Sequence, residues 1–296
     1  MEEETSGMFR NFVSNLVDDV KKLGKGSFGT VILGLWKKER VAVKIIKRRS
    51  SLTNELNALG LKHENVTKIK NVIEDTDIDN QKSAIIVLEY VGQNNLQALI
   101  EKSDLSNDVI KSFLVQIAKG LNYCHAHLVA HLDLKPSNIL VTSTGQCKLA
   151  DFGCSIKLKT KNEINDINTL CPGTPGYQAP ELFTMKNFSM KSDIFSLGIL
   201  IWQIIVKEYQ PYPGWHPHTI IFKVTAQNIR PTKEPSKVWN KYQTFYKTCW
   251  SSKAEDRPNS LDVLRTLVTL NKTNAGSGST SKMSSTSSRK SSGIRI

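Results

Sequence analysis

The chain has 296 residues, 39% of them hydrophobic, which is enough for a sizeable core and at this length for two lobes. Its five cysteines are odd in number and show no C-x-x-C spacing, which argues against a disulfide framework and a structural zinc site. The net charge of +13 could suggest nucleic-acid binding, but five basic residues lie in the stretch 271–296 and the remainder lacks an aromatic-basic strand pattern, so we expect no nucleic-acid partner.

Residues 1–19 are predicted to form an N-terminal extension. The chain begins Met1-Glu2-Glu3-Glu4, which is acidic, whereas a secretory signal begins with basic residues. The apolar residues that follow have i, i+3, i+4 spacing, which predicts a short helix lying on the domain. We therefore expect no export and a reducing, cytoplasmic location.

A glycine-rich stretch comes next and has the pattern G-x-G-x-x-G-x-V between residues 24 and 31. Its glycines would let backbone amides approach phosphate oxygens without a Cβ in the way. Taken alone, the pattern fits a simple turn between strands equally well. A dinucleotide-binding fold would need a helix directly after the glycines, whereas a strand is predicted over 31–36.

A lysine, Lys44, lies in the next predicted strand, 41–46, which follows a polar hairpin connection at 37–40. Burying an ammonium group is costly without an anionic partner. A helix is predicted over 52–59, with its three leucines on one face. Glu55 of that helix is the expected partner of Lys44, the alternative being an ordinary surface acid.

Two further elements are predicted before the most informative stretch. The apolar run 84–92 predicts a core strand leading into the connection between the lobes. A helix capped at Ser106 follows, and its core face consists of Val109, Ile110, Phe113, Leu114, Ile117 and Leu121. The histidines near its end, His125 and His127, together with His131, could suggest a metal site, but structural roles are favoured.

The stretch 131–140 places a carboxylate, an amine and an amide within six residues: Asp133, Lys135 and Asn138. Apolar residues on both sides can anchor such a loop in a core. Asp151 supplies a second carboxylate, in an Asp-Phe-Gly turn. Together with Asp151, the stretch therefore presents a candidate base, a phosphate-directed cation and two candidate metal ligands.

After Asp151 the chain is predicted to be polar and flexible up to Ala179-Pro180-Glu181, and then to continue through a buried helix to a tail. The buried Glu181 needs a cationic partner, for which we expect Arg257. The apolar run 194–206 is too short to cross a bilayer and predicts a buried core helix, with Asp193 at its start bracing the loop at 131–140. Residues 271–296 are rich in Ser, Thr and Lys, which predicts disorder.

These motifs, in this order, resemble those of eukaryotic protein kinases over about residues 20–270. Lys135 followed by Pro136, and Thr174, resemble the serine/threonine class. Within that class, four stretches are similar to the Mos family: 54–57, 131–136, 151–155 and 228–231. The resemblance implies an α+β bilobal fold, with a β-rich N-lobe at 20–91, a helical C-lobe at 92–270 and a tail at 271–296.

The resemblance also implies ATP and Mg²⁺ as cofactors. Asp133 would accept the substrate hydroxyl proton, Lys135 would face the γ-phosphate, Lys44 paired with Glu55 would hold the phosphates, and Asn138 and Asp151 would hold Mg²⁺. The residues implied around the nucleotide are Leu23, Gly24, Lys25, Gly26, Ser27, Phe28, Gly29, Val31, Ala42, Lys44, Leu88, Glu89, Val91 and Leu140.

Resemblance to the Mos family further implies a cytoplasmic kinase that acts on a MAP kinase kinase in oocyte meiosis, expected to be a monomer without a membrane partner. Leu132 stands where most kinases have an arginine. We therefore expect activity without a phosphate on the activation segment, which is the stretch between Asp151 and Glu181. Two alternatives are a pseudokinase scaffold and a small-molecule phosphotransferase. The first usually lacks a catalytic residue that this chain has, and Ala179-Pro180-Glu181 resembles a protein-substrate platform.

Overall fold

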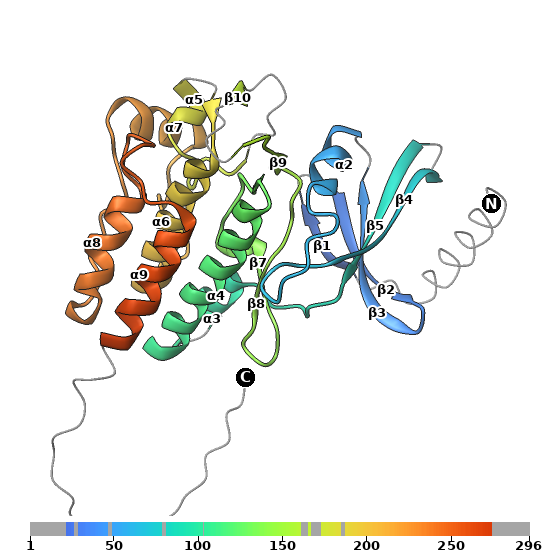
Figure 1. Ribbon diagram of the computed structural model, residues 1–296, viewed down its shortest axis with the longest axis horizontal. Coiled ribbons are helices and arrows are strands. Elements are labelled where there is room, and N and C mark those ends of the chain that lie inside the picture. The colour runs from blue at the N-terminus through green and yellow to red at the C-terminus, as the bar shows by residue number, and fades with distance from the viewer. Residues whose placement is uncertain are drawn as a thin grey trace, which may run out of the picture.

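The computed structural model describes residues 22–26, 29–46, 49–78, 81–102, 104–160, 165–166, 173–184 and 187–273. A β-sheet forms one lobe and a group of helices forms the other (Figure 1). The predicted α+β bilobal fold is confirmed. The predicted N-terminal extension and nearly all of the predicted tail lie outside the described residues.

The N-lobe is a five-stranded antiparallel sheet with the order β1-β2-β3-β5-β4. Its strands are β1 (Lys22–Gly26), β2 (Gly29–Trp36), β3 (Glu39–Ile46), β4 (Ile69–Ile78) and β5 (Gln81–Glu89). Side chains alternate between the two faces. One face packs Val41 and Val43 against Ile85 and Val87, and the other carries Lys44 toward the second lobe.

The connection between β2 and β3 is shorter than predicted. Lys37 and Lys38 both have positive φ, 51° and 67°, and form a two-residue turn, which suits the twist of the flanking strands. Residues 39 and 40 therefore belong to β3 and not to the polar connection predicted for 37–40.

Helix α2 (Arg49–Leu56) begins and ends three residues before the predicted helix. Leu52 is buried and Leu56 packs against the core, but Leu59 is 56% exposed, so the prediction that it shares their face is wrong. The N–H groups of Asn57 and Ala58 bond to carbonyls three residues back, which tightens the chain after the helix and turns Leu59 outward.

The C-lobe is built around helix α6 (Met190–Val206), which is buried on almost all sides, as predicted for a core helix. None of the helices in the described ranges is both long and apolar enough to span a bilayer. The other helices of the lobe are α3 (Leu96–Lys102), α4 (Asn107–Ala126), η1 (Pro136–Asn138), α5 (Glu181–Thr184), α7 (Pro217–Ala226), η2 (Lys237–Trp239), α8 (Asn240–Cys249) and α9 (Ser260–Thr273).

Short strands of the C-lobe flank the stretches singled out in the sequence. They pair as three two-stranded ladders: β6 (Val129–Ala130) with β9 (Ile156–Lys157), β7 (Ile139–Val141) with β8 (Cys147–Leu149), and β10 (Asn165–Asp166) with β11 (Asn187–Phe188). The stretch 131–140 therefore leaves β6 and enters β7, which holds it at both ends.

Two predictions about C-lobe helices need correction. Ser106 caps α4 by accepting a hydrogen bond from the N–H of Val109, as predicted, but Val109 itself is 38% exposed because it lies on the outer side of the first turn. Helix α9 continues to Thr273, three residues into the predicted tail. Asn271 explains this, since its amide donates to the carbonyl of Lys111 at 3.1 Å and its oxygen accepts from Tyr242.

Candidate active site

A pocket of about 440 Å³ lies between the two lobes. The predicted nucleotide contacts that line it are Leu23, Gly24, Gly29, Val31, Ala42, Lys44, Leu88, Glu89, Val91 and Leu140. Lys25 and Gly26 lie in β1, and Ser27 and Phe28 fall outside the described residues. Apolar side chains supply much of the wall, which suits a flat aromatic base, and the charged groups Lys44, Glu55 and Asp151 also line it.

Some lining residues were not predicted. Thr67 lies two residues before β4, Ile69 is the first residue of β4, and Ala150 directly precedes Asp151. The alternation of Thr67 and Ile69 with two lysines is typical of a strand with one buried face. Nothing local places that face against the pocket.

Gly29 is required by the sheet itself. A Cβ at this position would collide with the carbonyl oxygen of Ile45 on β3. The last glycine of the loop thus allows β2 to approach β3 closely, a different reason from the approach to phosphate that the pattern suggested.

Lys44 forms ion pairs with both Glu55 and Asp151, the second with Nζ and Oδ1 2.5 Å apart. The three residues come from β3, from α2 and from the turn after β8. The short interval between Lys44 and Glu55 is accommodated because β3 ends at Ile46 and α2 begins at Arg49. The predicted pair is therefore present, and Asp151 joins it from the other lobe.

Burial and charge act in opposite directions on these three groups. Burial alone lowers the pKa of Lys44, but the neighbouring carboxylates outweigh it and hold that pKa above its ordinary value. Burial raises the pKa of Glu55 to about 7, with Asp151 adding to the effect and Lys44 opposing it. Burial would also raise the pKa of Asp151, but Lys44 lowers it overall, so Asp151 remains an anion.

Asp133 is buried and its carboxylate accepts hydrogen bonds at both oxygens. Oδ2 accepts from Lys135 Nζ at 2.7 Å and from Asn138 Nδ2 at 3.0 Å. Oδ1 accepts from the N–H and hydroxyl of Thr174 at 3.0 and 2.8 Å. Lys135 also donates to the Thr174 hydroxyl, so Thr174 contacts both Asp133 and Lys135.

Asp193 holds the backbone of the two residues before Asp133, as predicted. Its carboxylate accepts from the N–H groups of His131 at 2.8 Å and Leu132 at 2.7 Å, and contacts His125 Nε2 at 2.9 Å. Leu132 has φ of 60°, a conformation that costs energy for a bulky residue. The two bonds to Asp193 stabilise that conformation and so fix the position of the base.

Asn138 and Asp151 fit a magnesium site. The amide nitrogen of Asn138 is used by Asp133, which leaves its oxygen, the atom that Mg²⁺ prefers. No group of three or more Cys, His, Asp or Glu side chains suited to a metal occurs within the described ranges. A metal here would take its other ligands from water and phosphate, which is usual for Mg²⁺ in phosphoryl-transfer sites.

The side chain of Glu89 has a structural role. Its carboxylate accepts from the N–H of Lys68 at 2.8 Å and from Lys148 Nζ at 2.9 Å. Its own N–H donates to the carbonyl of Lys68 at 3.0 Å. These bonds tie β5 to β4 and to the C-lobe, so any contact of Glu89 with an adenine edge would use its backbone carbonyl.

The predicted pair of Glu181 and Arg257 is also present. Arg257 is fully buried and donates from both terminal nitrogens to the Glu181 carboxylate, at 2.7 and 2.8 Å. Such two-point binding is geometrically specific, and it fastens the end of the segment that carries Thr174 to the C-lobe.

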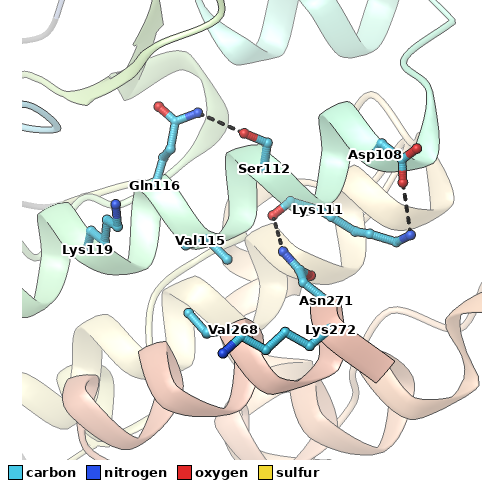
Figure 2. A pocket seen from close by; sticks show the side chains of 9 residues that line it. All are labelled: Asp108, Lys111, Ser112, Val115, Gln116, Lys119, Val268, Asn271 and Lys272. Carbon is cyan, nitrogen blue, oxygen red and sulfur yellow. Dashed lines mark hydrogen bonds and ion pairs between the residues drawn. The ribbon is translucent and has the colours of Figure 1, made fainter. Parts of the chain in front are cut away.

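A second, larger concavity of about 680 Å³ lies on the C-lobe between α4 and α9 (Figure 2). Its lysines are partly neutralised, because Lys111 bonds to Asp108 at 3.0 Å and Lys119 pairs with Glu64 at 3.5 Å. It shares no residue with the pocket between the lobes and brings together none of the candidate catalytic groups.

Comparison with known proteins agrees with this geometry. Residues 17–268 match the family model for the protein kinase domain. The chain is 36% identical to the serine/threonine-protein kinase mos of Patiria pectinifera, over 83% of this chain and 72% of that protein. It is 31% identical to the Xenopus laevis mos kinase, over 84% and 74%, and 30% identical to the Mus musculus proto-oncogene mos kinase, over 80% and 76%. The chain therefore belongs to the protein kinase family and is a serine/threonine kinase related to Mos.

Proposed function

We propose that this kinase is a Mos-type MAP kinase kinase kinase, which uses Mg²⁺-ATP to phosphorylate serine on a MAP kinase kinase in oocyte meiosis. We place it in the cytoplasm, as a monomer. The observation that carries the proposal is the similarity to Mos kinases of three animals over at least 80% of this chain. The assembled site supports it, because each catalytic side chain has its partners.

The proposed reaction joins the substrate hydroxyl oxygen to the γ-phosphorus of ATP while ADP leaves. Asp133 orients the hydroxyl and receives its proton, for which the bonds from Thr174 and Asn138 hold the carboxylate in place. Lys135 lies beside it, where its charge can offset that of the transferred group. Lys44 binds the other phosphates. Mg²⁺ would supply neutralising charge between Asn138 and Asp151.

Positioned acid-base groups contribute about 10²- to 10⁴-fold to rate. Asp133→Asn should therefore remove nearly all turnover. The dissociation constant for ATP should stay within about threefold of the wild-type value, because Asp133 contacts the substrate hydroxyl and not the phosphates. Lys44→Met should lose both turnover and ATP affinity.

The test is transfer of labelled phosphate from Mg²⁺-ATP to a catalytically inactive MAP kinase kinase. Lys70→Met is a matched control, since Lys70 lies on β4 and pairs with Glu39 outside the pocket. Transfer by the wild type and the control, lost in both active-site variants, would support the proposal. Autophosphorylation without this transfer would contradict the proposed substrate. Absence of any phosphate transfer would favour a scaffold without catalysis.

A further inference from the structure

Helix α2 and Asn57, the residue directly after it, are joined to the chain just after Asp151 by three side-chain hydrogen bonds. Asn54 Nδ2 donates to the carbonyl of Gly153 at 3.0 Å, and Asn57 Nδ2 donates to the carbonyl of Ser155 at 2.9 Å. In the other direction, the Ser155 hydroxyl donates to the carbonyl of Asn54 at 2.7 Å. We call these three residues the α2 interlock.

The position of α2 depends on such contacts. The helix has eight residues, and an isolated helix of that length is not stable in water. Its apolar anchors are few: Leu52 is buried and Leu56 is partly buried. Hydrogen bonds from neighbouring elements therefore contribute a large share of what fixes its orientation.

The interlock lies directly beside the charged site. Glu55 stands between Asn54 and Asn57, and Asp151 lies two residues before Gly153. Both carboxylates contact Lys44. A movement of α2 away from the C-lobe would break the interlock and the Lys44 contact with Glu55 together, so the two sets of bonds stabilise one arrangement.

Burial makes the hydrogen bonds of the interlock difficult to replace with bonds to water. Ser155 is fully buried, so its hydroxyl and carbonyl cannot exchange their partners for water without a local opening of the structure. Two stretches about a hundred residues apart, 54–57 and 151–155, both resemble the Mos family, and in the structure side chains of each bond to backbone carbonyls of the other.

We propose that Asn54, Asn57 and Ser155 are positioning residues that hold α2 in its active place. Kinase activity requires the lysine–glutamate pair and the metal-binding aspartate to be in place together. The interlock supports this arrangement from within the chain, because it joins the helix that carries Glu55 to the residues just after Asp151. This goes beyond the proposed pathway and holds for any protein substrate.

The test uses full-length protein and the variants Asn57→Ala, Asn57→Asp and Ser155→Ala. Asn57→Asp keeps the shape of the side chain but cannot donate a hydrogen bond. Comparing it with Asn57→Ala separates the effect of losing the hydrogen bond from the effect of losing side-chain packing. Asn71→Ala and Asn71→Asp, on β4, are matched controls that leave the interlock intact. Autophosphorylation rate, hydrogen exchange of residues 49–60 and Tm are measured for each.

We expect a fall in kcat of about tenfold for each interlock variant, since one hydrogen bond is worth roughly a factor of ten. Hydrogen exchange should rise in residues 49–60 but not in α6. Asn57→Ala combined with Ser155→Ala should lose less than the product of the single losses, because both hold the same helix. Unchanged kcat and exchange would overturn the proposal, and so would faster exchange spread evenly over both lobes, which would indicate a general loss of stability.

Discussion

Thr67 carries a buried hydroxyl group for which the described part of the chain offers no hydrogen-bond partner. The residue is only 4% exposed and lies at the pocket wall. A buried polar group without a partner lowers the free energy of unfolding, because it gives up its hydrogen bonds to water on folding. Among single residues, it is an identifiable weak point of this fold.

Thr67→Val should raise the free energy of unfolding by about 1 kcal/mol, because valine has the same shape and no hydroxyl to desolvate. Urea unfolding measures this. Thr142→Val is the matched control, since the Thr142 hydroxyl bonds to Thr144 and accepts from the N–H of Gln146, both at 2.9 Å. The control should be unchanged or less stable. A loss of stability in Thr67→Val would contradict the prediction.

At the scale of elements, Leu132 joins the catalytic loop to the segments around it. Its side chain is buried in a cluster with Ala130, Cys154, Leu158, Phe188 and Met190. These residues come from β6, from the segment after Asp151, from β11 and from the start of α6. Apolar packing against Leu132 therefore anchors the beginning of the activation segment. An arginine at this position would instead need a phosphate or another anion to neutralise it.

We expect phosphatase treatment of the purified kinase to change its activity by no more than about twofold, since the structure has an apolar anchor in place of a phosphate-binding arginine. Initial rates before and after treatment measure this. A loss of activity that is also produced by Thr169→Ala, and not by a control substitution at Thr160, would contradict it. Thr169 itself lies outside the described residues.

At the scale of the whole molecule, the contacts of Lys44 connect the two lobes. Lys44 and Glu55 belong to the N-lobe and Asp151 to the C-lobe. Two carboxylates share one buried ammonium group: burial raises the pKa of Glu55 despite Lys44, whereas Lys44 outweighs burial at Asp151 and lowers its pKa. The protonation of Glu55 should therefore affect how firmly the lobes are joined.

This predicts a pH dependence of stability. The pKa of Glu55 rises from 4.5 to about 7 on folding, so between these values the folded protein binds more protons at this site than the unfolded chain. The contribution of Glu55 is fully present below pH 4.5 and is lost as the pH rises to about 7. Relative to Glu55→Gln, which stays neutral, the wild type should lose stability over this range in urea unfolding. A difference that stays constant or grows would contradict the prediction.

Much of the site could be predicted from the sequence because its parts are local. Asp133, Lys135 and Asn138 lie within one loop, so their proximity follows from chain connectivity alone. The pairs of Lys44 with Glu55 and of Glu181 with Arg257 could be predicted as well, since a buried charge needs a partner of opposite sign. Resemblance to a known family supplied their roles.

Helix ends and exposed positions were less predictable. Leu59 and Val109 match the helical period but are exposed, because the first follows a tightened turn and the second lies on the outer side of a helix start. Helix α9 runs past its predicted end because Asn271 finds partners on two other helices. In each case a contact or a turn outside the local pattern decided the result.

The sequence by itself determined three strands of the N-lobe, the buried core helix and the catalytic loop at 131–140, since periodicity and short motifs act between near neighbours in the chain. Only the tertiary structure decided that Asp151 shares Lys44 with Glu55, that Thr67 faces the pocket, and that Asn54 and Asn57 bond to the segment after Asp151. These contacts join residues far apart in sequence, and their formation depends on how two lobes pack, which no local pattern encodes.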